Sequence, residues 1–407
     1  MSNVEAGRAA RASGGPWLLV AAAVLLCLQW VGVWAFGGHP GQPFTALLPG
    51  LCIFGAAFLL TWAAEAAEKD IPQSVAIGIL ALIAVLPEYA VDMYFAWKAA
   101  KDPVYTAYAA ANMTGANRLL IGVGWPAVLF ACWFKRRQKT VRLSERNSPE
   151  IITLLVATLY SIILPLKSTL SLMDCVFLLS LFGVYAYMCS RAEVEEPEIV
   201  GPALIIAGLP ALWRRLAVAA LFLFSAFAIF ISAEPFAEGI LELGRHWGIE
   251  EFILVQWLAP LASEAPEFIV ALLFALKGKA EVGLRTLVSS KVNQWTLLVG
   301  MLPAAYSLSA GHPAAMHLDA RQAEEILLTS AQSLFGIVVL MNLTFSIPEA
   351  VMLFSLFTTQ MFFPQTEVRY SFACLYFILS VGLMLAQRDR ALHLREMLAR
   401  VIKTVGG

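Results

Sequence analysis

Long apolar runs, separated by short polar breaks, cover most of this chain. Roughly 20 consecutive apolar residues are the length that an α-helix needs to cross a bilayer. The breaks contain residues that end helices, as at His39-Pro40-Gly41. The pattern predicts about twelve membrane-spanning helices, with eleven as the alternative because two runs are short. They are expected at 17–36, 45–67, 72–98, 105–134, 150–166, 170–190, 214–234, 251–277, 283–309, 325–342, 346–363 and 368–387.

The composition agrees with this interpretation. Of the 407 residues, 59% are hydrophobic and 14% are charged, and the mean hydropathy is +0.73. Such a chain is too apolar for a water-soluble fold, so an all-α polytopic protein of the lipid bilayer is expected. A net charge of −1 argues against a nucleic acid partner. The six cysteines stand singly in apolar runs, which predicts neither redox nor zinc chemistry.

The dipeptide Pro-Glu occurs twice within long apolar runs, as Pro87-Glu88 and Pro266-Glu267. A carboxylate at the bilayer centre costs about 2.5–3.5 kcal/mol, so its presence in lipid indicates a function. The residues that follow each copy also match. Segment 117–124 aligns without a gap to segment 293–300, and each begins with Asn and ends with Gly. An internal duplication explains both observations. A further Pro-Glu, within 346–349, suits an ordinary helix start.

Basic residues gather in two places, the loop 135–149 and the C-terminal tail from Arg388. The positive-inside rule places both in the cytoplasm. Twelve helices with a cytoplasmic N-terminus satisfy this placement, and they make the two Pro-Glu helices run in opposite directions. Equivalent helices of opposite direction define an inverted repeat. We therefore expect an integral protein of the plasma (inner) membrane with both termini in the cytoplasm.

The motifs around the two Pro-Glu copies resemble the sodium/calcium exchanger membrane region, a family of cation/calcium antiporters. In that family, each half carries a segment similar to Ser-Leu-Pro-Glu, followed by Gly-Asn-x-x-Gly-Ser-Asn. Here the first half offers Val-Leu-Pro-Glu at 85–88 and Ala-Asn-Met-Thr-Gly-Ala-Asn at 111–117. The second half offers Ser-Glu-Ala-Pro-Glu at 263–267, and Ser-Ser-Lys-Val-Asn at 289–293 matches less well.

The resemblance implies a fold of two inverted five-helix repeats, with about one extra helix at each end. The chain then divides into five parts. These are an N-terminal tail and extra helix, a first repeat, a cytoplasmic linker, a second repeat, and an extra helix with a basic tail, at 1–44, 45–190, 191–213, 214–363 and 364–407.

The resemblance also implies an ion site, in which Glu88 and Glu267 are the paired metal ligands. Neutral oxygens would complete it. A hard cation such as Ca²⁺ takes six to eight oxygen ligands, which carboxylates, amides, hydroxyls and carbonyls can supply. The two prolines remove backbone donors and are expected to break their helices beside the carboxylates. The neutral ligands are expected to be Asn112, Thr114, Asn117, Ser263, Ser290 and Asn293.

Four charged residues depart from the family pattern and are expected to modulate the site. Lys291 puts an ammonium within about one helical turn of Ser290 and Asn293, where it could replace a bound Na⁺. Asp92 and Glu264 each share a helix face with a ligand carboxylate, and either could pair with a buried cation. Arg118 could belong to the site or extend to the membrane interface. The modulating set is Asp92, Glu264, Lys291 and Arg118.

These features predict a secondary antiporter that exchanges Ca²⁺ or a similar cation for Na⁺ or H⁺, by alternating access at a midplane site. Its partners would be inorganic cations and lipid, with no cofactor, and the sequence sets no oligomeric state. One alternative is a Na⁺/H⁺ exchanger on the same scaffold, and another is a non-transporting relative locked by Lys291. An intramembrane enzyme is disfavoured because His-x-x-Glu-His and Gly-x-Ser-x-Gly patterns are absent.

Overall fold

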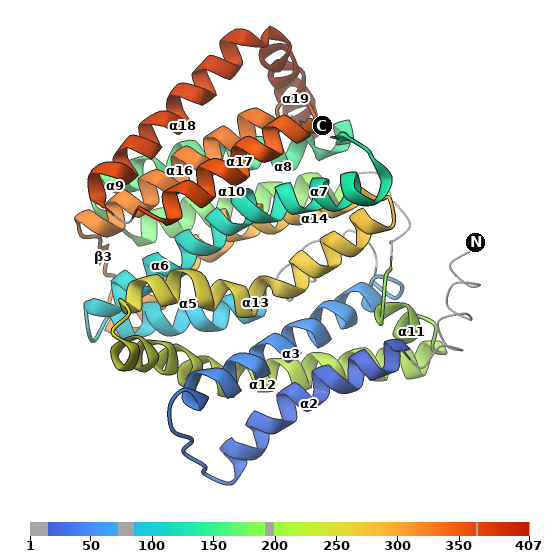
Figure 1. The fold of residues 1–407 in the computed structure, drawn as a ribbon, viewed down its shortest axis with the longest axis vertical. Helices are drawn as coiled ribbons and strands as arrows, with labels where there is room; N and C mark the ends of the chain where they lie inside the picture. The colour runs from blue at the N-terminus through green and yellow to red at the C-terminus, as the bar shows by residue number, and fades with distance from the viewer. Residues whose placement is uncertain (1–14, 72–84, 192–198, 364, 407) are drawn as a thin grey trace. The chain divides into compact units, whose positions relative to one another are not determined.

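The computed structural model describes residues 15–71, 85–191, 199–363 and 365–406 (Figure 1). Parts of three expected segments fall outside these residues: the N-terminal tail, the start of the 72–98 helix and the start of the linker. The described elements are helices, with two small sheets. Their bounds are α2 Gly15–Ala35, α3 Phe44–Ala67, α5 Leu86–Ala99, α6 Val104–Leu119, η1 Leu120–Gly124, α7 Trp125–Arg136, η2 Glu145–Asn147, α8 Ser148–Ser161, α9 Ile163–Lys167, α10 Leu172–Ser190, α11 Ala203–Ala207, α12 Ala211–Trp247, α13 Glu251–Leu276, α14 Ala280–Asn293, η3 Gln294–Leu298, α15 Val299–Ala310, α16 Ala320–Leu340, α17 Ile347–Met361, α18 Thr366–Ala386 and α19 Arg388–Gly406.

The number of spans agrees with the sequence prediction. Within the described ranges, nine helical segments are long and apolar enough to cross a membrane. The α14–η3–α15 run, the 15-residue α17 and the described part of α5 supply three more. The chain is thus an all-α polytopic membrane protein with about twelve spans. The Pro-Glu at 348–349 is a helix start as expected, because Ser346 and Glu349 form the capping box of α17.

One predicted boundary is wrong. The connection after the expected 214–234 span was predicted to begin after residue 234, but α12 runs for 37 residues, through Pro235, to Trp247. Proline has no N–H, so the carbonyl of Ile231 loses its helical donor. The indole N–H of Trp30 on α2 donates to that carbonyl at 3.2 Å. A side chain from another helix therefore replaces the missing hydrogen bond, and the helix continues.

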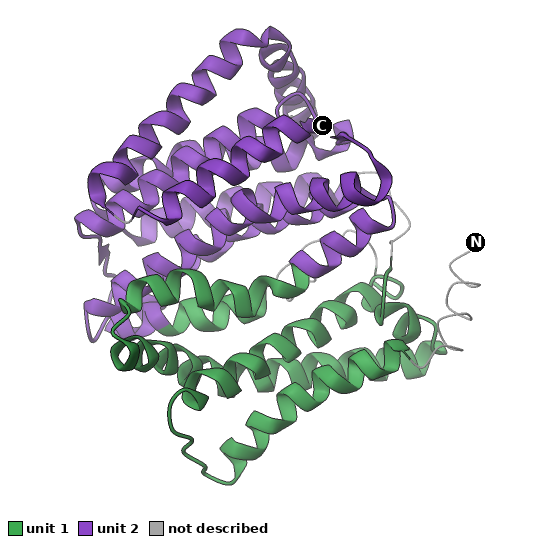
Figure 2. Ribbon diagram, in the orientation of Figure 1, with its two compact units in different colours: residues 1–94, 193–267 green, residues 95–192, 268–407 purple. Residues whose placement is uncertain are grey.

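The described residues form two compact units, each built from both halves of the sequence (Figure 2). Unit 1 comprises residues 1–94 and 193–267, and unit 2 comprises 95–192 and 268–407. In unit 1, α3 packs against both α2 and α12. Glycines permit this approach: a Cβ on Gly239 of α12 would lie 2.6 Å from the carbonyl oxygen of Thr45 on α3.

The sheets of unit 2 display the inverted repeat. Strand β1 (Thr140–Arg142), before α8, pairs antiparallel with β4 (Thr344–Ser346), after α16. Strand β2 (Thr169–Leu170), after α9, pairs with β3 (Met316–His317), before α16. This crosswise pairing requires α8 and α16 to run in opposite directions. Each half also contains a π-helix shortly after its motif asparagine, η1 in the first half and η3 in the second.

Candidate ion-binding site

Every residue that the sequence placed at the site is buried, as lipid-embedded functional residues should be. The residues are divided between the two units. Unit 1 holds the carboxylates and one hydroxyl: Glu88, Asp92, Ser263, Glu264 and Glu267. Unit 2 holds the amides, the remaining hydroxyls and the two cations: Asn112, Thr114, Asn117, Arg118, Ser290, Lys291 and Asn293.

The helix α13 was predicted to break at its Pro-Glu motif, and this prediction is wrong. The helix is continuous through Pro260 and Pro266. Because Pro266 lacks an N–H, the carbonyl of Ala262 loses its usual helical donor without any break in the chain's path. The hydroxyl of Ser263 donates to the carbonyl of Ala259 at 3.2 Å, which supports the same turn. A continuous helix with a freed carbonyl therefore carries the carboxylate.

Glu267 has an oxygen available for a ligand. The side chain is buried, with 8% of its surface exposed, and no donor within the described residues bonds to its Oε2. Buried polar atoms are normally hydrogen-bonded, so an oxygen in this state indicates a bound cation or a proton. Ser290 Oγ and Asn293 Oδ1 of unit 2 are in the same situation across the described ranges.

Unit 1 also contains acids that the sequence analysis missed. The Tyr94 hydroxyl on α5 donates to Glu238 Oε1 at 2.6 Å and lies 3.3 Å from Glu234 Oε1, both on α12. These contacts join the helix that carries Glu88 to the long helix α12. Glu234 is the last residue of the expected 214–234 span and Glu238 lies beyond it, so the expected span did not place the two acids together on one helix.

Lys291 binds the motif asparagine of the other half. Its ammonium lies 2.9 Å from Asn117 Oδ1 and 3.3 Å from the Asn117 carbonyl oxygen. The amide nitrogen of Asn117 donates to the Met113 carbonyl at 2.8 Å, which turns Oδ1 toward the lysine. The ammonium also lies 5.0 Å from the centroid of the Trp295 ring, a cation–π contact. Asn117, which was predicted to bind an ion, thus binds a cation that belongs to the chain, through its side-chain oxygen and its carbonyl oxygen.

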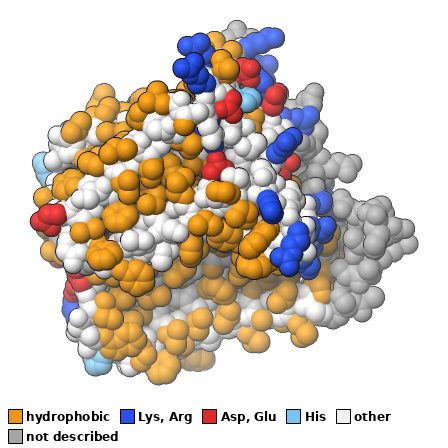
Figure 3. Space-filling model, turned by 45° about the horizontal axis from the view of Figure 1, so that its top comes forward, with side chains coloured by type: hydrophobic (Ala, Val, Ile, Leu, Met, Phe, Trp, Pro, Cys, Tyr) orange, Lys and Arg blue, Asp and Glu red, His pale blue; other side chains and the backbone are white. Residues whose placement is uncertain are grey.

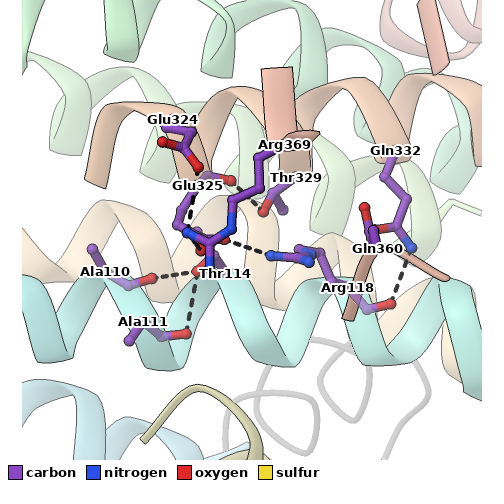
Figure 4. Close-up of polar contacts among 10 residues, drawn as sticks. All are labelled: Ala110, Ala111, Thr114, Arg118, Glu324, Glu325, Thr329, Gln332, Gln360 and Arg369. Atoms are coloured by element: carbon purple, nitrogen blue, oxygen red, sulfur yellow. Dashed lines mark hydrogen bonds and ion pairs between the residues drawn. The ribbon is translucent and has the colours of Figure 1, made fainter. Parts of the chain in front are cut away.

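Thr114 is one turn earlier on α6 and uses its proton locally. Its hydroxyl donates to the carbonyl of Ala110 at 2.6 Å and lies 3.2 Å from that of Ala111 (Figure 4). Ser263 bonds in the same way on α13. A hydroxyl whose proton is used by the helix still has lone pairs, so both oxygens remain acceptors for a cation.

Arg118 belongs to a buried charge cluster that links three helices (Figure 4). Its guanidinium lies 2.5 Å from Glu325 Oε2 on α16. The other oxygen of Glu325 lies 2.6 Å from the guanidinium of Arg369 on α18, which also contacts Glu324 at 3.3 Å. Two guanidinium groups therefore face two carboxylates, so the cluster is neutral as a group. We call these four residues the arginine–glutamate cluster.

The partners of Arg118 were not predicted from the sequence. Glu324, Glu325 and Arg369 stand near the starts of predicted spans, where charges look like the ends of loops. Two glutamines add further contacts: the Gln332 amide donates to the Arg118 carbonyl at 3.2 Å, and the Gln360 amide donates to Gln332 at 3.4 Å (Figure 4). Helices α16 and α17 thereby hold the end of α6, where Asn117 lies.

Comparisons with known proteins identify the family and the fold. A family model described as sodium/calcium exchanger protein matches residues 43–191 and 217–364. A solved structure of the H⁺/Ca²⁺ exchanger CAX is 45% identical, with a TM-score of 0.92, covering 96% of this chain and 99% of that one. A search of curated proteins found no match.

Two other solved structures share the fold at lower identity. Native YfkE is 15% identical, with a TM-score of 0.59, covering 91% of this chain and 99% of that one. The sodium-calcium exchanger NCX_Mj is 15% identical, with a TM-score of 0.51, covering 78% of this chain and 97% of that one.

Proposed function

Because the chain belongs to the sodium/calcium exchanger protein family and is a cation/Ca²⁺ antiporter, we propose that it exchanges Ca²⁺ for H⁺ and not for Na⁺. The observation that carries this proposal is the ammonium of Lys291 on the two oxygens of Asn117. The relative that is 45% identical is described as an H⁺/Ca²⁺ exchanger, which supports the same assignment.

Lys291 occupies the position that a sodium ion bound to Asn117 would need. An ammonium carries the same single positive charge as Na⁺ and prefers the same oxygen atoms as partners. It is tethered to α14, so it can neither leave with the transported ion nor be exchanged across the membrane. A sodium site that used Asn117 would therefore be permanently filled. Protons, which need only a carboxylate, remain as the coupling ions.

Glu88 and Glu267 are the Ca²⁺ ligands in this proposal. Neutral oxygens from both halves complete the shell, and the buried acceptors of Glu267, Ser290 and Asn293 noted above support the assignment. Two carboxylates match the charge of one Ca²⁺, and the same two groups can carry two protons on the return step. The charge of the site then stays constant as it alternates between the two sides of the membrane.

Asp92 and Glu264 modulate the site in this proposal, because each adds negative charge close to a ligand carboxylate on its own helix. Lys291 and Arg118 supply the opposing positive charge. Arg118 acts through the arginine–glutamate cluster, which cancels its charge locally. The net effect on the ion is then set by the acids and by Lys291.

We further propose that both termini and the loop 135–149 are cytoplasmic, in the plasma (inner) membrane. The repeat boundaries proposed are 45–190 and 214–363, joined by the cytoplasmic linker 191–213. Single cysteines near Lys139 and Arg395, placed in a background without other reactive cysteines, test the orientation. Labelling of both from the cytoplasmic side is expected, and labelling from opposite sides would refute the orientation.

Vesicle transport tests the function directly. Purified protein in liposomes should take up Ca²⁺ when a pH gradient is imposed, and a Na⁺ gradient without a pH gradient should drive no uptake. Glu88→Gln and Glu267→Gln should each abolish uptake, whereas Glu367→Gln, which changes an exposed acid on α18, should not. Uptake driven by Na⁺ alone would overturn the proton assignment, and wild-type flux in both site variants would overturn the ligands.

A further inference from the structure

The last helix, α19, begins at the membrane surface. It follows α18 after a single residue, Gln387, and its course differs from that of α18 (Figure 1). Helix α18 has 21 residues and the hydropathy of a membrane span. Because a helix of that length matches the hydrocarbon core of a bilayer, its end at Ala386 reaches the headgroup region. The first turn of α19 therefore lies beside lipid headgroups.

Contacts on its inner face fix how α19 is rotated. The guanidinium of Arg390 is buried and donates to the carbonyls of Val338 and Val339, at the C-terminal end of α16. It also lies 2.5 Å from Glu349 Oε1, in the first turn of α17. A guanidinium on the last carbonyls of a helix is a favourable C-terminal cap, so this anchor is strong.

A second contact holds the far end of the helix. Arg400 pairs with Glu145, in the short 3-10 helix η2 before α8, at 2.9 Å. Met397, between the two anchors, is buried. The side of α19 that bears Arg390 and Met397 is thus turned toward the rest of unit 2, and the opposite side is turned outward.

The outward side combines large apolar residues with cations. Leu392, Leu398 and Ile402 are exposed by 59%, 37% and 68%. Three cations, Arg388, Arg395 and Lys403, are exposed among them. At 100° per residue all six fall within less than half of the helix circumference. Around the top of the view in Figure 3, basic and hydrophobic side chains lie next to one another. We call these six residues the outer face of α19.

The exposed acids of α19 lie to one side of this face. Asp389 and Glu396 are exposed, and at helical spacing they follow Lys403 around the circumference. In a helix that lies in the plane of a membrane, apolar residues face the acyl chains, nearby cations reach the phosphates and acids face water. On α19 the cations stand between the apolar residues of the outer face, and the acids lie beyond them. Negative lipid headgroups attract basic segments within about one Debye length, roughly 8–10 Å.

We propose that the outer face of α19 binds the anionic phospholipid headgroups of the bilayer that the protein spans. The three cations bind the phosphates, and Leu392, Leu398 and Ile402 insert among the upper acyl groups. A water-exposed protein partner fits less well, because α19 starts at the end of a membrane span and its face carries both charges and apolar bulk. This proposal does not depend on which ion drives Ca²⁺ transport.

Hydrogen–deuterium exchange of the full chain in nanodiscs tests the proposal. One lipid mixture is phosphatidylcholine alone, and the other adds phosphatidylglycerol. Backbone amides of residues 388–404 should exchange several-fold more slowly in the anionic mixture, and high salt should remove the difference. Amides of α16 should exchange equally in both mixtures, which serves as an internal control for the protein's overall stability.

Two charge variants separate lipid binding from a general charge effect. The triple variant Arg388→Gln, Arg395→Gln, Lys403→Gln should lose the lipid dependence of exchange. The matched variant Asp389→Asn, Glu396→Gln should retain it, because these acids lie outside the outer face. Equal exchange of wild-type α19 in the two mixtures would overturn the proposal. So would a lipid dependence that survives in the triple variant, or protection of the same size in detergent without phospholipid.

Discussion

Two buried cations of unit 2, Arg118 and Lys291, have partners of different chemistry. Arg118 follows Asn117 in the chain and binds Glu325, a carboxylate that also binds Arg369. Lys291 binds Asn117 itself, through amide and carbonyl oxygens, and lies over the Trp295 ring. A planar guanidinium suits paired carboxylates, whereas a compact ammonium can take the place of an ion among neutral oxygens. The contrast separates a structural cation from one placed among predicted ion ligands.

The largest expected effect comes from breaking the structural cation's pairing. Glu325→Gln removes the charge that Arg118 and Arg369 share, so Arg118 loses its 2.5 Å contact with a carboxylate and Arg369 keeps only the longer contact with Glu324. Removing one partner of a buried ion pair costs about 3–5 kcal/mol. Thermal unfolding of the purified protein in detergent should therefore begin at a clearly lower temperature. Glu145→Gln, which removes the partly exposed pair with Arg400, is the control and should cost less than about 1 kcal/mol. Equal melting of both variants would contradict the structural role.

The second prediction concerns Lys291. Lys291→Ala should leave the protein folded but open the oxygens of Asn117 to a free cation. We expect Ca²⁺ transport to become Na⁺-dependent, with an apparent Na⁺ affinity at least about tenfold higher than that of the wild type, which corresponds to about 1.4 kcal/mol. The pH profile of transport should also shift, because the acids would lose a countercharge.

Lys291→Arg sharpens this test. The guanidinium is larger and planar, so it should not restore wild-type transport if the compact ammonium stands in for an ion. Transport assays in liposomes with Na⁺ and pH gradients varied separately give the readout. A Lys291→Ala protein with unchanged ion dependence and pH profile would make the lysine a purely structural residue and remove the main support for proton coupling.

The third prediction concerns the contribution of α18 to thermal stability, through Arg369. Arg369→Gln removes the second guanidinium from the arginine–glutamate cluster but leaves the contact between Arg118 and Glu325 intact. Hydrogen bonds to charged groups contribute about 1.5–3 kcal/mol, so this variant should melt at a temperature between those of wild type and Glu325→Gln. Arg369→Lys should recover part of the loss. Melting as low as that of Glu325→Gln would show that Arg118 alone cannot hold the carboxylate.

The comparison also shows what a sequence can predict. The paired carboxylates and Lys291 stand out because a charge inside an apolar run has few structural explanations. The number of helices can also be predicted from the sequence, because the bilayer thickness sets the length of an apolar run that spans it. The direction of the repeat is confirmed by the crosswise strand pairs of unit 2.

The partners of Arg118 could not be predicted, since the contact with Glu325 spans 207 positions and depends on how α6 packs against α16. The same limit explains the wrong end of α12. Its continuation through Pro235 depends on the indole of Trp30, which is 201 positions away from the carbonyl that it binds. Local sequence patterns predict where helices form. Whether a missing hydrogen bond is replaced depends on contacts between residues that are distant in the sequence.

The smallest expected effect on stability belongs to an ion pair in unit 1. It shows how little a partly exposed pair contributes compared with the buried arginine–glutamate cluster. Asp70, after α3, lies 2.6 Å from Arg214 and 3.0 Å from Arg215. Hydrogen bonds from Arg214, and then from Arg215, lower the pKa of the Asp70 carboxyl to about 2. A carboxyl with a lowered pKa stabilises the fold above its ordinary pKa of about 3.9, and the contribution disappears as the pH falls through about 2.

Asp70→Asn should lower the free energy of unfolding near neutral pH by about 1 kcal/mol. This is less than the lowered pKa alone implies, because the exposed side chain of Arg215 leaves these ion pairs open to screening by solvent. The difference from wild type should shrink between about pH 4 and pH 2, and the two proteins should melt together below that range. Melting temperatures measured across this pH range check the sign and the window. A difference that persists at the acid end would mean that the Asp70 side chain acts by packing, and the contrast with the buried arginine–glutamate cluster would then not be one of electrostatics.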